Sequence, residues 1–308
     1  MKHSRLFEFR EFLNLKSFAA VLIAGPTASG KSARAVSLAR EHHGIVINAD
    51  SMQVYRDLAI LSARPNPVDE GGAPHLLFGH IGAERNYSVG QWLVDARWAL
   101  EEALRMGRMP IFVGGTGMYF KALIQGLSAI PAVPSEIRDR VRDQSDGVAP
   151  EELHARLQAL DPETAARLRP TDPQRIIRAL EIFAATGQPL AHFQGVREKP
   201  LLDATRCRAL FVAPEKVELN QRIDGRFDQM MRDGALEEAA RLMARGLDPA
   251  LPAMRAVGVP GLIDFLRETC TLEAAVERGK RDSRQYAKRQ FTFARTQLPE
   301  FEWVAPEF

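Results

Sequence analysis

Uninterrupted hydrophobic stretches recur along the first third of the chain and return once near residue 210. Within them, apolar residues do not alternate with polar ones, a pattern typical of parallel strands that are buried on both faces. We therefore predict four strands, at residues 21–24, 44–49, 109–113 and 208–213.

The segments between the first predicted strands have sequence patterns that are typical of helices. Residues 32–40 are compatible with a helix, and a second helix is predicted from Ser88, a good N-cap residue, through Met106. Its apolar residues recur at helical spacing on one face: Trp92, Ala96, Ala99 and Ala103. Strands and helices that alternate with short connections predict an α/β fold with a central parallel sheet.

A different pattern covers residues 126–200, where no strand is predicted and several helices begin. Asp161-Pro162 and Asp172-Pro173 each combine an N-cap residue with a proline at the first helical position. The predicted organisation is a helical insertion, residues 126–200, within a core of residues 19–125 and 201–308, after an N-terminal extension of residues 1–18.

Basic residues concentrate in the insertion and on two later helices. The insertion carries eight arginines between Arg138 and Arg178. Arg222 and Arg226 lie four residues apart and therefore share one helix face. A final helix, at residues 272–296, is predicted to present a stripe of Arg281, Arg284, Lys288 and Arg295. Such faces are either solvated or bind phosphate, and the Arg222–Arg226 pair would suit a diphosphate.

Composition narrows the function classes. The 308 residues are 45% hydrophobic and 26% charged, as in ordinary globular proteins, and a net charge of +2 does not by itself indicate nucleic acid. Two isolated cysteines, Cys207 and Cys270, exclude a disulfide framework and fit a reducing cytoplasm. No uncharged stretch is long enough to span a membrane, and the first residues lack the apolar region of a secretion signal.

The first predicted strand leads directly into Gly25-Pro-Thr-Ala-Ser-Gly-Lys-Ser32, which has the spacing of a P-loop. In this motif Gly25 and Gly30 let the backbone turn and expose its N–H groups to an anion, together with the N-terminus of the following helix. Lys31 would reach the outer oxygens of a diphosphate, and the Ser32 hydroxyl would complete the coordination of Mg²⁺. The segment is therefore predicted to bind phosphate.

Polar residues follow the two strands next to this loop. Asp50 ends the second strand, at the edge of the sheet where ligands bind in α/β proteins. Three roles are open for it: a general base, a metal-associated carboxylate, or a turn cap formed with Ser51. The third strand ends in Gly114-Gly-Thr116-Gly117, where P-loop NTPases have an Asp, and the missing acid disfavours ordinary ATP hydrolysis. Glycines at such a place permit close approach of another chain segment or a substrate.

The segment Asp172-Pro-Gln-Arg175 has two open interpretations. It caps a helix in either case, and Gln174 and Arg175 on an exposed first turn are also suited to contacts with nucleic acid. The arginine-rich insertion and the basic stripe, with Arg284 and Lys288, together favour a polyanion as partner.

Five motifs occur in the chain in a fixed order. They are residues 25–32, Asn48-Ala-Asp-Ser-Met-Gln-Val-Tyr55, Gly114-Gly-Thr-Gly-Met-Tyr-Phe120, Asp172-Pro-Gln-Arg175 and Ala287-Lys-Arg-Gln290. With them the sequence, from about residue 20 to residue 293, resembles the bacterial tRNA dimethylallyltransferase (isopentenyltransferase) family. The resemblance implies a P-loop NTPase-like α/β core with a helical insertion that grips the anticodon stem-loop of tRNA. It also implies transfer of a dimethylallyl group, with Mg²⁺, from dimethylallyl diphosphate to N6 of the adenosine just 3′ of the anticodon.

The resemblance also implies roles for individual residues. Asp50 would be the general base on N6, and Thr116 would lie beside the reacting amine. The diphosphate would be held by residues of the P-loop: Thr27, Ala28, Ser29, Gly30, Lys31 and Ser32. The adenosine pocket would be lined by Ser51, Met52 and Gln53. Places where the family meets tRNA correspond to Arg138, Asp172, Pro173, Gln174, Arg175, Ile176 and the segment that begins at Arg255.

Two other functions stay open at this point. A small-molecule kinase would place ATP in the P-loop and use Asp50 to activate a hydroxyl. An RNA-binding protein gated by a nucleotide would explain the basic faces but not Asp50 beside the P-loop. For the favoured function we expect a cytoplasmic monomer with Mg²⁺ as cofactor and with tRNA and dimethylallyl diphosphate as partners, away from membranes.

Overall fold

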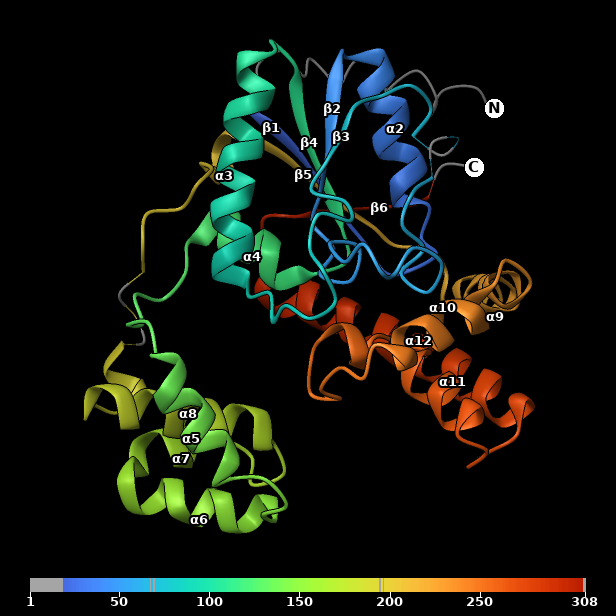
Figure 1. The fold of residues 1–308 in the computed structure, drawn as a ribbon. Helices are drawn as coiled ribbons and strands as arrows, with labels where there is room; N and C mark the ends of the chain where they lie inside the picture. The colour runs from blue at the N-terminus through green and yellow to red at the C-terminus, as the bar shows by residue number, and fades with distance from the viewer. Residues whose placement is uncertain (1–18, 67, 69, 194, 196, 307–308) are drawn as a thin grey trace. The chain divides into compact units, whose positions relative to one another are not determined.

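The structure, a computed structural model, describes residues 19–66, 68, 70–193, 195 and 197–306. It divides into two compact units, one made of Met1–Ile124 with Pro200–Phe308 and the other of Gln125–Lys199 (Figure 1). The predicted N-terminal extension, residues 1–18, lies outside the described residues.

A six-stranded sheet, with every pair of neighbours parallel, forms the centre of the larger unit (Figure 1). Its spatial order is β3-β2-β4-β1-β5-β6. The strands are β1 (Ala20–Ala24), β2 (Gly44–Asn48), β3 (His75–Leu76), β4 (Met109–Gly114), β5 (Cys207–Val212) and β6 (Glu302–Val304). The four predicted strands are confirmed. The two edge strands, β3 and β6, were not predicted, because two or three residues are too few to show a hydrophobic pattern.

Strand β1 lies between β4 and β5 and is buried on both faces. Val21 and Ile23 belong to a cluster with residues of α2 (Lys31–Glu41). Leu22 belongs to the cluster on the opposite face, with residues of α3 (Val89–Arg105). Burial on both faces explains why this strand has no polar alternation, as predicted.

Helix α3 secures the strand end that leads to Asp50. It begins with a capping box, in which the Gln91 N–H donates to Ser88 Oγ (3.3 Å) and the Ser88 N–H donates to Gln91 Oε1 (2.8 Å). The indole of Trp92 stacks on Tyr119 with centroids 4.1 Å apart, and its Nε1 donates to the carbonyl of Asn48 (3.0 Å). The four residues of the predicted apolar face are all buried.

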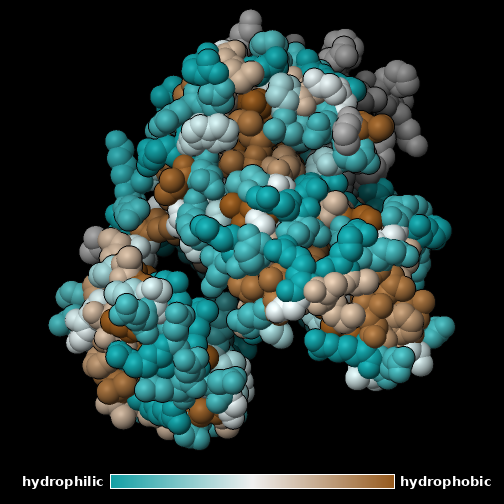
Figure 2. All heavy atoms as spheres, in the orientation of Figure 1, coloured by the Kyte–Doolittle hydropathy of each residue, from teal (hydrophilic) through white to brown (hydrophobic). Residues whose placement is uncertain are grey.

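The described residues of the larger unit form five further helices. They are α4 (Gly117–Gln125), α9 (Lys216–Arg232), α10 (Ala235–Ala244), α11 (Val259–Leu266) and α12 (Leu272–Gln297). Hydrophilic residues cover most of the face visible in Figure 2, with smaller hydrophobic areas between them. Among the helices in the described part of the chain, none combines the length and apolarity that a membrane crossing requires.

The smaller unit consists of helices around a core of its own. They are α5 (Ser135–Asp143), α6 (Pro150–Leu160), α7 (Pro162–Arg167) and α8 (Pro173–Thr186). The two predicted caps are confirmed: Asp161 accepts from the Thr164 N–H (3.0 Å), and Asp172 accepts from the Arg175 N–H (3.3 Å). Arg142 and Arg178 both pair with the buried Glu181, at 2.9 and 3.1 Å. These two arginines therefore stabilise the fold of the smaller unit itself.

Candidate active site

Residues 25–30 form the loop that connects β1 to α2. Ala28 (φ 61°) and Gly30 (φ 85°) have left-handed backbone conformations, which a non-glycine residue adopts only when its surroundings impose them. Gly30 is the N-cap of α2 and makes no side-chain cap hydrogen bond. The first N–H groups of α2 are therefore suited to an anion. The predicted strand–loop–helix arrangement is confirmed, whereas phosphate binding stays a prediction.

Lys31 lies at the first turn of α2, with charged groups on two sides. Its Nζ donates to the carbonyl of Pro26 (3.0 Å). Burial lowers the pKa of Lys31 to about 8; the Asp50 carboxylate opposes this shift, and the Arg226 guanidinium adds to it. These three side chains, which come from distant parts of the sequence, therefore lie close enough to sense one another's charge.

The backbone around Asp50 is held by a buried asparagine. Asn48 Nδ2 donates to the carbonyls of Asp50 (2.9 Å) and Leu77 (3.0 Å), and Asn48 Oδ1 accepts from the Asp50 N–H (2.9 Å). Asp50 Oδ1 accepts from the Met52 N–H (3.0 Å). Asn48 belongs to one of the five sequence motifs, but no role was predicted for it. A polar residue that ends an apolar strand is the signal that points to it.

Thr116 joins the turn that follows Asp50. Its Oγ1 accepts from the Ser51 N–H (2.9 Å) and donates to Ser51 Oγ (3.2 Å). Burial raises the pKa of Tyr286 on α12, the Asp50 carboxylate raises it further, and a hydrogen bond with Thr116 opposes the rise. The structure therefore gathers Asp50, Thr116 and Tyr286, while Ser51, Met52 and Gln53 lie half-buried on the same turn.

Gly114 and Gly115 permit close packing of three chain segments. A Cβ at position 114 would lie 2.0 Å from the carbonyl oxygen of Ala49. At position 115 it would lie 2.1 Å from Gln290 Nε2 and 3.1 Å from Asp50 Oδ2. The glycines are required because the turn before Asp50 and helix α12 approach the end of β4 this closely.

Gln290 on α12 connects the P-loop segment to the end of β4. Its Oε1 accepts from the Thr27 N–H (3.1 Å), and its Nε2 donates to the carbonyl of Gly115 (2.9 Å). The side chain is 7% exposed, so both hydrogen bonds are protected from water. No role in the site was predicted for Gln290, because its two partners lie more than 170 residues away in the sequence.

The two arginines of the predicted diphosphate clamp have different neighbours. Arg226 acts on the charge of Lys31, as described above. Arg222 pairs with Glu218, one helical turn earlier, at 2.6 Å. Arg226 therefore affects the charge of Lys31, and Arg222 forms an ion pair within α9.

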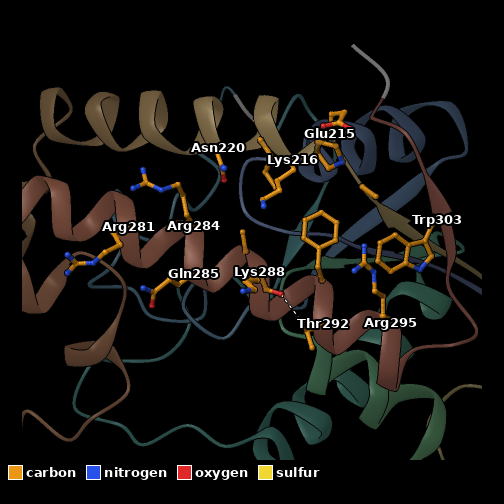
Figure 3. Close-up of a pocket in the computed structure, with 15 residues that line it drawn as sticks. Glu215, Lys216, Asn220, Arg281, Arg284, Gln285, Lys288, Thr292, Arg295 and Trp303 are labelled. Atoms are coloured by element: carbon orange, nitrogen blue, oxygen red, sulfur yellow. Dashed lines mark hydrogen bonds between the residues drawn. The ribbon is translucent and has the colours of Figure 1, made fainter.

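The basic stripe on α12 lines a cavity of about 790 Å³. All four predicted members, Arg281, Arg284, Lys288 and Arg295, contribute to it, which confirms that they share one face. Figure 3 shows Lys216 of α9 on the wall opposite Lys288, and Arg295 beside Trp303 of β6. Arg284 pairs with Asp224, and the Arg295 guanidinium lies 5.3 Å from the centroid of the Trp303 ring.

This cavity adjoins the P-loop segment. Ala28 packs against a cluster that contains Leu219, Ala287 and Phe291, and these three residues also line the cavity. Arg255, by contrast, lies on a short 3₁₀ turn (Ala253–Arg255) and lines a separate cavity of about 160 Å³, together with Arg278 and Arg289.

The remaining predicted tRNA contacts belong to the smaller unit. Pro173, Gln174 and Arg175 are exposed on the first turn of α8, and Arg138 is half-buried and donates to the carbonyl of Val133 (3.1 Å). Ile176 is 0% exposed, in the core of the unit. Its side chain packs in this core, and a contact of this position with tRNA stays a prediction.

The sequence matches known protein families and is similar to proteins of several bacteria. The family model "IPP transferase" matches residues 53–297, and the model "Isopentenyl transferase" matches residues 18–73. The tRNA dimethylallyltransferase of Beijerinckia indica is 60% identical, covering 94% of this chain and 95% of that protein. The protein of the same name from a Bradyrhizobium species is 57% identical, with 94% of both chains covered.

Two solved structures are similar to this chain. The full-length tRNA isopentenylpyrophosphate transferase of Bacillus halodurans is 34% identical with a TM-score of 0.66, covering 93% of this chain and 89% of that one. A eukaryotic dimethylallyltransferase acting on tRNA is 28% identical with a TM-score of 0.79. The match covers 93% of this chain and 73% of that one.

Proposed function

Because this chain belongs to the tRNA dimethylallyltransferase family, we propose that it transfers a dimethylallyl group from dimethylallyl diphosphate to tRNA. The acceptor is N6 of the adenosine just 3′ of the anticodon. The observation that carries the proposal is that Lys31 follows β1 and Asp50 follows β2, two strands that run in the same direction in one sheet, so that both residues lie at its carboxyl edge. A cation for a leaving diphosphate and a base for an amine then lie at one edge of the sheet.

We call residues 25–32 with Arg226 the phosphate side of the site. In the reaction the C1–O bond of the donor breaks, and the diphosphate leaves with the electron pair. Backbone N–H groups at the start of α2 and the Lys31 ammonium stabilise the charge that grows on the leaving oxygens. Such preorganised donors lower the barrier, because they need no rearrangement as the charge develops.

We call residues 50–53 and 114–116 with Tyr286 the nucleoside side. The exocyclic amine of adenine is a weak nucleophile and becomes acidic only as the new N6–C1 bond forms. Asp50 then accepts the proton, while two hydrogen bonds between its backbone and the Asn48 side chain, and one from the Met52 N–H to its carboxylate, hold it in place. The target base must leave its stack to reach this site.

The family implies Mg²⁺, and the site suits a cation bound largely through the substrate. In the described part of the chain, His, Cys, Asp and Glu side chains form no group of three or more that could hold a metal. The Ser32 hydroxyl, at the start of α2, would be one ligand and diphosphate oxygens would supply others. The ion would neutralise charge on the leaving group.

The experiment that tests the proposal uses two labelled substrates. Unmodified tRNA is incubated with donor labelled in the dimethylallyl group or, separately, with ATP labelled in the γ-phosphate. We expect the dimethylallyl label to enter tRNA and the ATP label to enter neither tRNA nor a small acceptor. Transfer of phosphate would instead support the kinase, and binding of tRNA without any transfer would support the RNA-binding protein.

A further inference from the structure

Glu238 on α10 is a buried carboxylate whose partners all lie in one distant loop. It is 3% exposed. Its Oε2 accepts from the N–H groups of Ala59 (2.8 Å) and Ile60 (2.9 Å), and its Oε1 accepts from the N–H of Leu61 (2.9 Å). Three consecutive backbone donors thus converge on a single side chain about 180 residues further along the sequence.

Burial of a carboxylate carries a large desolvation penalty, which charge-assisted hydrogen bonds offset here. The loop depends on Glu238 as much as Glu238 depends on the loop, because no strand or helix pairs these three N–H groups in the described structure. Loss of the carboxylate would leave buried donors without an acceptor, so the loop would have to rearrange.

The segment held by Glu238 is connected directly to the nucleoside side. Gln53 Nε2 donates to the carbonyls of Ser62 (3.1 Å) and Ala63 (2.9 Å), which follow Leu61 immediately. At its other end the loop is attached through the Ser51 N–H to Thr116. The turn that carries Ser51, Met52 and Gln53 is thus fixed at the end of β4 on one side and to the Glu238-bound segment on the other.

Helix α10 makes a second, weaker attachment to the same loop. Arg245, just after α10, pairs with Asp57 (2.6 Å) and with Glu84 (2.7 Å). All three side chains are at least partly exposed, and exposed ion pairs contribute little. The buried contacts of Glu238 therefore dominate the connection between α10 and the loop.

We propose that Glu238 is a positioning residue that holds residues 51–53 where they receive the adenosine of tRNA. The inference rests on the proposed function for the identity of the bound nucleoside. It separates the two substrates, because residues 25–32 of the phosphate side connect β1 to α2, whereas the loop that follows residues 51–53 is held by Glu238 of α10.

The test compares Glu238→Gln with Glu237→Gln, a matched control at the next position of α10, whose side chain is exposed. Glutamine has one accepting oxygen instead of two, so its amide group would face at least one loop N–H. We expect E238Q to raise the KM for tRNA about tenfold or more, while the KM for dimethylallyl diphosphate stays within twofold. We expect E237Q to behave like the parent protein.

Amide hydrogen exchange supplies a readout that does not depend on activity. Exchange in residues 50–64 should accelerate in E238Q and not in E237Q, while α2 keeps its protection. An unchanged KM for tRNA with unchanged exchange would overturn the inference, as would an equal rise in both KM values. If E238Q does not fold, E238D, whose carboxylate is withdrawn by one methylene, is tested in the same way.

Failure of the inference is distinguishable from failure of the proposed function. If the parent protein transfers no dimethylallyl group, the proposed function fails, and hydrogen exchange still decides whether Glu238 holds the loop. If the parent is active but E238Q keeps the parental kinetics and exchange, only the role of Glu238 fails.

Discussion

The phosphate side of the site is largely one continuous segment, residues 25–32, whereas the nucleoside side combines segments from three distant places in the chain. On the phosphate side, the proposed ligand contacts are backbone N–H groups at the start of α2 and one lysine. On the nucleoside side, Thr116 accepts from the N–H of Ser51, next to Asp50, and forms a side-chain hydrogen bond with Tyr286. A site built from backbone tolerates changes in side chains better than one assembled from them.

This difference also decides what substitutions should do. Changes on the nucleoside side should affect chemistry and the acceptor, and changes on the phosphate side should affect the donor. Gln290 is the exception, because it bonds to both sides. The four predictions below follow in order of decreasing effect.

Asp50→Asn gives the largest expected effect. Asparagine keeps the size of the side chain but cannot accept the N6 proton, so turnover should fall by roughly 10²–10⁴. Binding of tRNA, measured by filter retention, should stay near the parental value, because the turn around residue 50 is held by Asn48. Single-turnover kinetics measure the chemical step itself. Turnover within threefold of the parent would remove Asp50 from the role of base.

Gln290→Ala should weaken both sides at once. It removes the acceptor for the Thr27 N–H and the donor to the Gly115 carbonyl, so the P-loop and the Thr116 turn lose their connection. We expect kcat/KM for both substrates to fall by about 10 to 100-fold, since small misplacements are costly in an active site. Gln285→Ala, an exposed glutamine on the same helix, is the matched control. If only one substrate is affected, Gln290 does not couple the two sides.

The pH dependence of donor binding tests the phosphate side alone. With a pKa lowered to about 8, Lys31 is cationic below that value and neutral above it. Diphosphate favours the cation, so the KM for the donor should rise above pH 8, by at most about tenfold per pH unit. Because Asp50 raises this pKa, the rise should begin at lower pH in D50N. A flat profile from pH 7 to 9 would show that Lys31 does not bind the donor as its cation.

Arg175→Ala should produce the smallest of the four effects. Arg175 is exposed at the start of α8, and a single phosphate contact accounts for about one unit in the salt dependence of tRNA binding. We expect tRNA affinity to fall several-fold, with no change in donor affinity, and Arg175→Lys to recover most of it. Equal losses for tRNA and donor would indicate a folding defect instead.

The sequence was a good guide to the phosphate side and an incomplete one to the nucleoside side. Residues 20–32 form a strand, a loop and a helix within a single stretch, so local patterns were sufficient to predict them. Gln290, Asn48 and Glu238 act through partners far away in the sequence, and no local pattern shows such pairs. The burial of Ile176 was likewise not apparent from its motif, because a motif does not show which side chains of a helix face the core.

The edge strands also could not be predicted from local sequence patterns. The four central strands carry enough buried residues to be recognised, and the capped helices carry their own signals at Ser88, Asp161 and Asp172. Strands β3 and β6 exist because β2 and β5 offer free edges, which is a property of the assembled sheet.

The most direct test of the central claim is mass spectrometry of nucleosides from tRNA that has been incubated with the protein, dimethylallyl diphosphate and Mg²⁺. We predict that N6-dimethylallyladenosine appears at the position just 3′ of the anticodon, that it depends on the donor, and that D50N yields far less in the same time. Unmodified adenosine at that position after incubation with folded parent protein would contradict the account.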